Sequence, residues 1–335
     1  MNTLIIKSPG TSLKPLPLAD HMALRVFRTK TTDQTKFLHL QIGGQGKVVA
    51  RGGRFYLNPE DTVGQGTFEW NGGVIGILFK LDPGSNEAFL NFPDTSWNKW
   101  RIQYGSGFLP YTVDDPGVPR VDWTSNLYNL SSLSGMFQQR STMRDSPIYG
   151  IKRVADLGIG GGWFHFLDGC IEFNEDIDMI DTTGYLDFRA ALNDCWVFNK
   201  SVKKLNMKSA IDISEMFRRC FNFNKPIDEW GDLSWVDNFD AMFLECISYD
   251  QDLSFINFKT EANIGRMIMW SGMSPENYGK LLKKIDSIDF SARTSPKLIN
   301  AEAVYYDPKY KANRDSLVAK GWTIIDAGVI TYTII

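Results

Sequence analysis

The four cysteines of the chain recur at a nearly constant interval, which constrains the fold more than any other feature. They are Cys170, Cys195, Cys220 and Cys246, and their separations are 25, 25 and 26 residues. A fixed period of about 20 to 50 residues is the sequence signature of a solenoid, in which successive repeats stack. We therefore expect the cysteines to be equivalent residues of stacked coils.

Other positions repeat in step with the cysteines. The third residue after each cysteine is aromatic, and this column is Phe173, Phe198, Phe223 and Tyr249. The next residue carries an amide or acid, and this column is Asn174, Asn199, Asn224 and Asp250. Apolar residues also recur three and seven positions before each cysteine, and seven and ten after it. One such unit cannot bury its own apolar face, but a stack of units can.

Each coil is expected to have two sides. Before Cys220, the apolar residues Ile213, Met216 and Phe217 follow a spacing of three to four, which predicts a short inward-facing helix. After it, residues 223–230 predict a short strand or extended turn, with backbone groups that pair between coils. The amide column predicts a ladder of side chains that bond loop backbone. Weaker copies extend the array to about residues 121 and 273, with an insertion around 148–154.

The cysteines themselves are expected to be reduced and buried. The chain has no CxxC or HxxxH spacing that would indicate a zinc site. Nothing in the sequence marks secretion, so disulfides are not expected. A free cysteine in such a column behaves as a small hydrophobic residue. A hydroxyl at Cys220 would have no evident hydrogen-bond partner.

The sequence "DISEMFRRCFNFNKPIDEW" (212–230) resembles the BspA-like leucine-rich repeat, the 25-residue surface-protein repeat that is also multiplied in Mycoplasma lipoproteins. The segments "GMSPENYGKLLKKI" (272–285) and "YKANRDSLVAKGWTIIDAG" (310–328) resemble the closing segments of such arrays. The resemblance implies a curved right-handed solenoid that displays a binding surface and has no catalytic activity. Members of the family usually carry a signal peptide or lipobox, and this chain shows neither, so the resemblance favours a phage virion version.

The predicted fold class is α+β, with four parts. Residues 1–107 form a β-rich attachment domain, an antiparallel sandwich or small barrel of about eight strands. Its expected strands include 37–42, 66–70, 73–81, 87–92 and 100–104, separated by Gly-Gly, Asn-Gly and Asp-Pro-Gly turns. Residues 108–120 are a Pro-rich linker, 121–273 the solenoid, and 274–335 a C-terminal cap. In the cap, Ser274 and Pro275 begin one helix, and a second runs from about 308 to 320 and ends at Gly321.

Composition excludes several function classes. Net charge is −3, with 36 basic and 39 acidic residues, so no field attracts nucleic acid. No apolar run approaches the roughly 18 residues of a membrane span, and the N-terminus shows no signal peptide. The loop 43–47 lacks phosphate-loop spacing, and 158–163 does not give GxGxxG. The histidines at 21, 39 and 165 are scattered, and the acids of 174–178 fall on repeat positions, so no catalytic residue, cofactor or metal site is expected.

These features predict a non-enzymatic structural or adhesion protein of a phage virion, such as a tail fibre, receptor-binding protein, or capsid or collar decoration. The N-terminal domain would bind other virion proteins in a multimeric assembly, and the solenoid a host surface protein or glycan. An intracellular or surface interaction scaffold is the alternative, and a carbohydrate-active depolymerase the third. The candidate binding surface lies on the side of the coil that follows each cysteine. It comprises Glu175, Asp176, Asp178, Lys200, Lys203, Lys204, Lys225, Asp228, Gln251 and Phe255.

Overall fold

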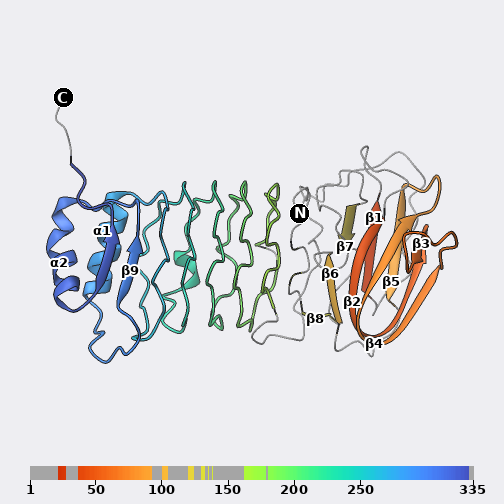
Figure 1. Cartoon of the computed structure of the whole chain (residues 1–335), viewed down its shortest axis with the longest axis horizontal. Coiled ribbons are helices and arrows are strands. Elements are labelled where there is room, and N and C mark those ends of the chain that lie inside the picture. Colours follow the sequence, from red (N-terminus) through yellow and green to blue (C-terminus); the bar gives the residue numbers. More distant parts are fainter. Residues whose placement is uncertain are drawn as a thin grey trace. The chain divides into compact units, whose positions relative to one another are not determined.

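The computed structural model describes residues 22–27, 37–92, 100–104, 120–123, 130–132, 135, 138, 162–178 and 180–331. The chain divides into two compact units (Figure 1). The first consists of residues 1–102, 115–130 and 147–152, and the second of 103–114, 131–146 and 153–335.

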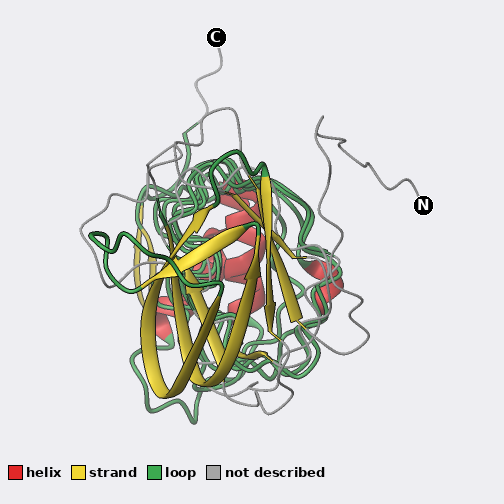
Figure 2. Cartoon of the chain, turned by 90° about the vertical axis from the view of Figure 1, so that its right-hand side faces the viewer, coloured by secondary structure: helices red, strands yellow, loops and turns green. Residues whose placement is uncertain are grey.

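The first unit contains most residues of an eight-stranded sheet, seen as curved strands in Figure 2. Its strands are β1 (Met22–Phe27), β2 (Leu38–Arg51), β3 (Gly53–Tyr56), β4 (Thr67–Leu81), β5 (Glu87–Phe92), β6 (Trp100–Tyr104), β7 (Arg120–Trp123) and β8 (Leu130–Ser132). The main order is β3-β4-β2-β5-β1-β7, and β6 pairs with β2 and β8. The pairings between β1, β2, β3, β4, β5 and β7 are antiparallel. Several side chains of these strands are almost completely buried, namely Val48, Phe55, Phe79 and Leu90.

The prediction of two strands at 66–70 and 73–81 is wrong, because both belong to the single strand β4. The Gly-Gly and Asn-Gly pairs that were expected to form turns lie inside β2 and β4 instead. Gly43 pairs with Val74 and Gln45 with Asn71, so one residue of β2 faces two of β4 between these pairs. Glycine relaxes the backbone at this β-bulge, which lets two long strands bend without a break.

Strand β7 lies where the first repeat was expected, yet it pairs with β1. Leu24 lies opposite Trp123, and Phe27 opposite Arg120. A short alternating sequence such as Arg-Val-Asp-Trp fits a sheet edge as well as the start of a coil, and the sheet takes it. The expected linker apart from Arg120, the insertion at 148–154 and the glycines at 158–161 lie outside the described residues.

In the second unit, residues 162–273 form successive coils that lie side by side (Figure 1). Backbone N–H groups of one coil donate to carbonyls of the next on the side that precedes the cysteines. Leu167 N–H donates to Ala191 O at 2.7 Å, and Leu192 N–H to Met216 O at 3.0 Å. Parallel bridges join Asp187, Asp212, Asn238 and Asn263 in turn. The prediction that the extended side would carry the backbone pairing is therefore wrong.

The short helix predicted before each cysteine is also wrong. Glu215 and Arg219 have φ of 54° and 57°, in the left-handed region that a right-handed helix excludes. Successive four-residue β-turns take its place: Arg218 N–H donates to Glu215 O at 3.1 Å, and Cys220 N–H to Phe217 O at 2.9 Å. These turns return every third or fourth side chain to the interior, so they produce the same sequence spacing as a helix.

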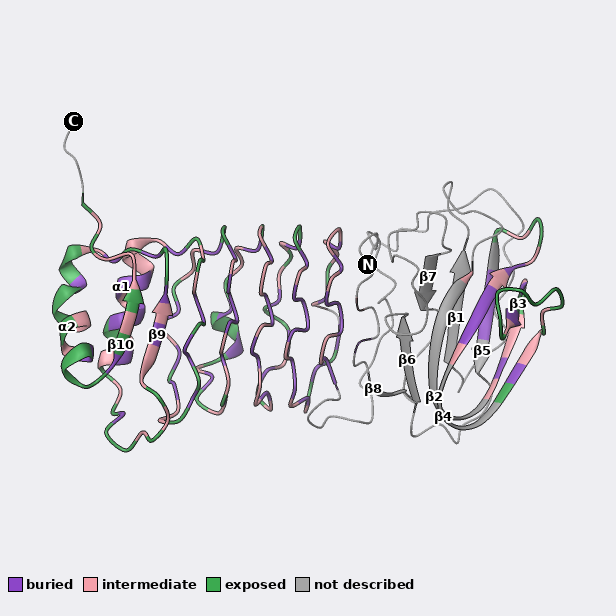
Figure 3. Ribbon diagram, in the orientation of Figure 1, coloured by how far each residue is buried: buried purple, intermediate pink, exposed green. Residues whose placement is uncertain are grey.

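The aromatic column forms a continuous stack in the core. Phe173 and Phe198 have ring centroids 6.0 Å apart, and Phe198 and Phe223 lie 5.8 Å apart. Tyr249 follows at 5.8 Å from Phe223 with an interplanar angle of 6°. Figure 3 shows the buried residues alternating with surface residues along every coil. Offset stacking of this kind adds about 0.5–1.5 kcal/mol per pair to the burial of the rings.

The last coil leads into a compact cap. It contains α1 (Pro275–Asp286), β9 (Leu298–Ala301), a 3-10 turn η2 (Pro308–Tyr310), α2 (Lys311–Ala319) and β10 (Thr323–Asp326). Another 3-10 turn, η1 (Asp228–Trp230), lies within the array. The predicted helix start is confirmed: Ser274 Oγ accepts from Asn277 N–H, and Pro275 occupies the first turn. The predicted second helix is η2 followed by α2, and Gly321 has a left-handed φ of 86°. Among the described residues, no helix is long and apolar enough to cross a membrane.

Candidate binding surface

The amide column forms a ladder on the extended side of the coils. Asn174 Oδ1 accepts from Asn199 N–H at 2.9 Å, and Asn199 Oδ1 accepts from Asn224 N–H at 3.0 Å. Asn224 Oδ1 in turn accepts from Asp250 N–H at 3.0 Å. Each side chain thus satisfies a backbone donor of the next coil, as the sequence predicts, and it replaces a β-ladder there.

The cysteine column is buried and free of disulfides. Cys195 Sγ lies 3.2 Å from Leu167 O, and Cys220 Sγ lies 3.0 Å from Leu192 O, so each thiol donates to a carbonyl of the preceding coil. The Cys220 thiol therefore has a hydrogen-bond partner, which the sequence did not reveal. Burial raises the pKa of the Cys195 and Cys220 thiols well above the ordinary value, with neighbouring cysteines adding to the effect. The thiolate that metals and electrophiles require is thus disfavoured.

All ten residues of the expected surface lie on the outside of the array. Five are exposed, namely Asp176, Lys200, Lys203, Lys204 and Asp228. Five are half-buried, namely Glu175, Asp178, Lys225, Gln251 and Phe255.

Neighbouring coils carry opposite charges on this side. Residues 171–186 contain five acids and no base, and residues 196–211 contain four lysines and no acid. Lys203 Nζ lies 3.1 Å from Glu229 Oε1 of the following coil. The backbone N–H of Lys204 donates to Asp178 Oδ1 of the preceding coil. The charges therefore offset one another between coils, so this side presents no strong field to a charged partner.

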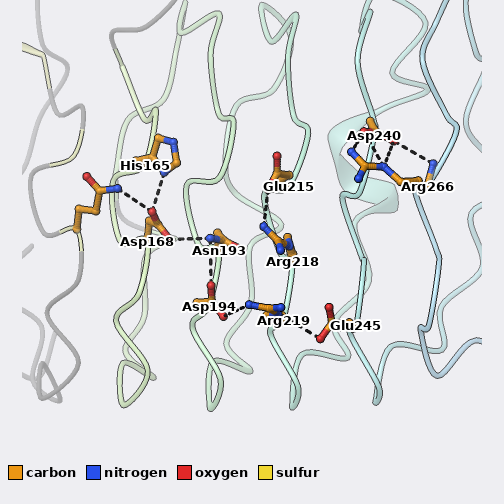
Figure 4. A network of polar contacts seen from close by, with 11 residues as sticks. His165, Asp168, Asn193, Asp194, Glu215, Arg218, Arg219, Asp240, Glu245 and Arg266 are labelled. Carbon is orange, nitrogen blue, oxygen red and sulfur yellow. Dashed lines mark hydrogen bonds and ion pairs between the residues drawn. The ribbon is translucent and has the colours of Figure 1, made fainter.

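The side that precedes the cysteines carries a polar network (Figure 4). Asp168 lies at its start, with Oδ2 2.7 Å from His165 Nδ1 and 2.8 Å from Gln138 Nε2. Asn193 Nδ2 donates to the other carboxylate oxygen at 2.7 Å. Asp168 is only 8% exposed, and three side chains satisfy the hydrogen-bonding capacity of its carboxylate oxygens.

The network continues along the next coils. Arg219 lies between Asp194, at 3.8 Å, and Glu245, at 3.2 Å. A hydrogen bond to Glu245 is the main cause that raises the pKa of Arg219. Asp240 holds Arg266 through both carboxylate oxygens in the same way. The charged side chains of this network are paired with each other, so it stabilises the joints between coils.

Exposed apolar side chains lie within two residues of the cysteine position in several coils. The large hydrophobic residues exposed between 162 and 273, within the described residues, are Trp196, Val197, Ile247 and Trp270. Trp196 and Ile247 directly follow a cysteine, and half-buried Phe221 occupies the same position in the coil between them. The Trp196 and Phe221 rings lie 5.6 Å apart. We call these five residues the apolar ridge.

The apolar ridge was not among the predicted site residues. Its signal was present in the sequence, since the position after each cysteine is Ile171, Trp196, Phe221 and Ile247. An apolar column in a repeat is assigned to the core by default, and only the coil path shows that this one points outward. Trp196 Nε1 donates to Asp194 Oδ1 at 3.2 Å, so the ridge borders the charged row of Figure 4.

The described residues contain no group of three or more His, Cys, Asp or Glu side chains that could hold a metal ion. Residues 164–277 match a protein-family model described as "Mycoplasma protein of unknown function, DUF285". The expected resemblance to a Mycoplasma-type repeat is thus supported over the cysteine-centred coils and the start of α1. No curated protein and no solved structure matches the chain.

Proposed function

We propose that the protein is a non-enzymatic interaction protein that binds a partner protein through the apolar ridge of its repeat array. The carrying observation is that exposed Trp196, Val197, Ile247 and Trp270 all lie within two residues of the cysteine position of their coils. Single exposed hydrophobic residues are ordinary, but a set that recurs from coil to coil and is bordered by polar groups is typical of protein contact sites. Tryptophan at such a site contributes strongly to binding, and the paired row of Asp194, Arg219 and Glu245 supplies a polar rim.

A more specific proposal is that this interaction protein is a BspA-like leucine-rich repeat protein at the surface of a phage particle. Its support is the repeat resemblance together with the family match over 164–277. In this proposal, the N-terminal sheet attaches to other virion proteins and the array contacts the host. The intracellular or surface scaffold would use the same ridge with a different partner.

Site-specific photocrosslinking tests this function. A photoreactive amino acid at Val197 lies on the ridge itself, and the same amino acid at exposed Lys208 reports on the extended side. In the native particle or cell, Val197 is expected to give a discrete crosslinked partner protein and Lys208 none. Crosslinks at Lys208 alone would transfer the binding site to the extended side.

A depolymerase would differ in a direct assay. Release of reducing ends from a polysaccharide by the intact protein, without crosslinks at Val197, would overturn the proposed function.

A further inference from the structure

The parallel rungs of the array continue into the cap, where they end on β10. After Asn263, the next rung is β9, because Asn300 N–H donates to Gly265 O at 2.6 Å. β10 then pairs with β9 in parallel, with Ile325 opposite Asn300. Each earlier rung is covered by the next coil. β10 is the last rung of the described chain, since its sheet has only these two strands.

The backbone groups of a strand point alternately to its two edges, so the hydrogen bonds to the preceding rung show which groups of β10 face away from β9. Thr323 N–H donates to Lys297 O at 2.8 Å, and Ala327 N–H to Val304 O at 2.9 Å. Odd-numbered residues therefore direct their backbone groups inward. The N–H and C=O of Ile324 and Asp326 point to the outer edge, where no described strand pairs with them.

The side chains at this edge do not protect it. Natural edge strands are often blunted by lysine or proline, and "TIID" contains neither. Ile325 is 44% exposed, and Val329 just beyond the strand is 40% exposed. The one charge, Asp326, is buried against Arg314 at 2.8 Å and does not face a partner.

We propose that this edge pairs with β10 of a second copy of the chain. Directly opposite residues of an antiparallel pair must both face the partner, so Ile324 lies opposite Asp326 of the second copy. The two-fold axis then passes beside Ile325, and four backbone hydrogen bonds form. In this register the two Ile325 side chains adjoin, Thr323 lies opposite Ala327, and no like charges lie directly opposite.

We favour a second copy over an unrelated strand because, in this register, each edge supplies the N–H and C=O groups that the other edge needs. Pairing identical edges about a two-fold axis also closes the assembly at two chains. The contact is small compared with the roughly 1,200 Å² of a stable interface, so we expect a weak dimer, with dissociation in the micromolar range or above.

Cysteine crosslinking of the full chain tests both the partner and the register. The native cysteines are buried, so background oxidation is low. Under mild oxidation, Ile325→Cys is expected to form a covalent dimer, because the Cβ atoms of such a non-hydrogen-bonded pair lie about 4.5–5.5 Å apart. Thr323→Cys alone is expected to stay monomeric, whereas Thr323→Cys with Ala327→Cys is expected to crosslink. Equal crosslinking of the two single variants would overturn the register.

Sedimentation velocity over a concentration series provides the second measurement. Ile325→Lys places two like charges beside the axis and is expected to raise the dissociation constant at least tenfold. Val63→Lys, at an exposed aliphatic residue between β3 and β4, is expected to leave it unchanged. Melting temperatures of both variants verify folding. A wild-type protein that stays monomeric at all concentrations, or an Ile325→Lys variant that dimerises as tightly as wild type, would overturn the proposal.

Discussion

The backbone N–H of Asn224 lies 3.0 Å from Oδ1 of Asn199, the residue 25 positions earlier. The same contact recurs at each joint, and the last one passes into the cap, where Asp250 Oδ1 accepts from Ser274 N–H at 2.8 Å. One polar position per coil therefore repeats the same joint along the extended side, while the other side is joined by backbone hydrogen bonds and by its charged network.

Replacing a ladder residue should cost more than its surface position suggests. Asn224→Ala leaves the N–H of Asp250 and the amide of Gln251 without their acceptor, which predicts a loss of about 1–3 kcal/mol. Asn224→Asp keeps an acceptor oxygen and should lose less. Urea unfolding measures both, with the exposed Asn222→Ala as the control, expected within about 0.5 kcal/mol. Equal stabilities of the two alanine variants would contradict the ladder.

The cysteine position should prefer sulfur to oxygen. Ser271 occupies this position in the next coil, and its buried hydroxyl has no partner among the described residues. A C–O bond is shorter than a C–S bond, so a serine does not reach the carbonyl that the thiols reach. Cys220→Ser is predicted to lose about 1–3 kcal/mol, and Ser271→Cys to gain on the order of 1 kcal/mol. Thermal and urea unfolding test the pair, and a gain from Cys220→Ser would refute the argument.

Native thiols should also react slowly. All four are buried, and burial raises the pKa of Cys195 and Cys220. A thiol reagent is expected to modify few groups in the native protein and four after denaturation. A disulfide in non-reducing mass analysis would contradict this prediction.

Glu261 should contribute an acid-sensitive stabilisation. Hydrogen bonds from Ser295, then from the backbone N–H of Thr294, lower the pKa of Glu261 from 4.5 to about 2. Because the folded-state pKa is depressed, the stabilisation is fully present above pH 4.5 and is lost as the pH falls toward 2. The stability difference between wild type and Glu261→Gln should therefore shrink over this interval. A difference that is constant with pH would rule this out.

The lysine coil lies between acidic coils, so the sign of a substitution should matter. Changing Lys200, Lys203 and Lys204 to Gln is expected to alter the melting temperature little, since exposed changes rarely exceed about 0.5 kcal/mol each. Changing all three to Glu adds repulsion with Asp176, Asp178 and Glu229 and should destabilise further. Added salt should reduce the gap between the two triple variants. If the gap is insensitive to salt, direct charge repulsion is not its cause.

The repeat could be found from sequence because the constraint on each core position is local. The aromatic column and Cys220 must fit the same space in every coil, and the sequence preserves that demand. The path between these positions could not be found in the same way. Turns with left-handed Glu215 and Arg219 give the same spacing as a helix, so hydrophobic period alone does not distinguish them.

The surface was harder still to predict. Trp196 and Phe223 are both aromatic and three positions or fewer from a cysteine, yet one is exposed and the other fully buried. The direction of each depends on the corner that the chain turns after the cysteine, which is a tertiary property. The bulge in β4 has the same origin, since Gly72 and Gly73 read as a turn until their partner strand β2 is known.

The ladder has a consequence for how such a chain can change in length. Each coil offers an acceptor forward and a donor backward, so the ladder hydrogen bond is equivalent at every internal joint. Duplicating a 25-residue segment such as 196–220 would add one coil and repeat this bond at both flanking joints. The apolar ridge would grow by one position at the same time. Gene duplication could thereby lengthen the contact row in fixed increments, without any redesign of the core or of the cap.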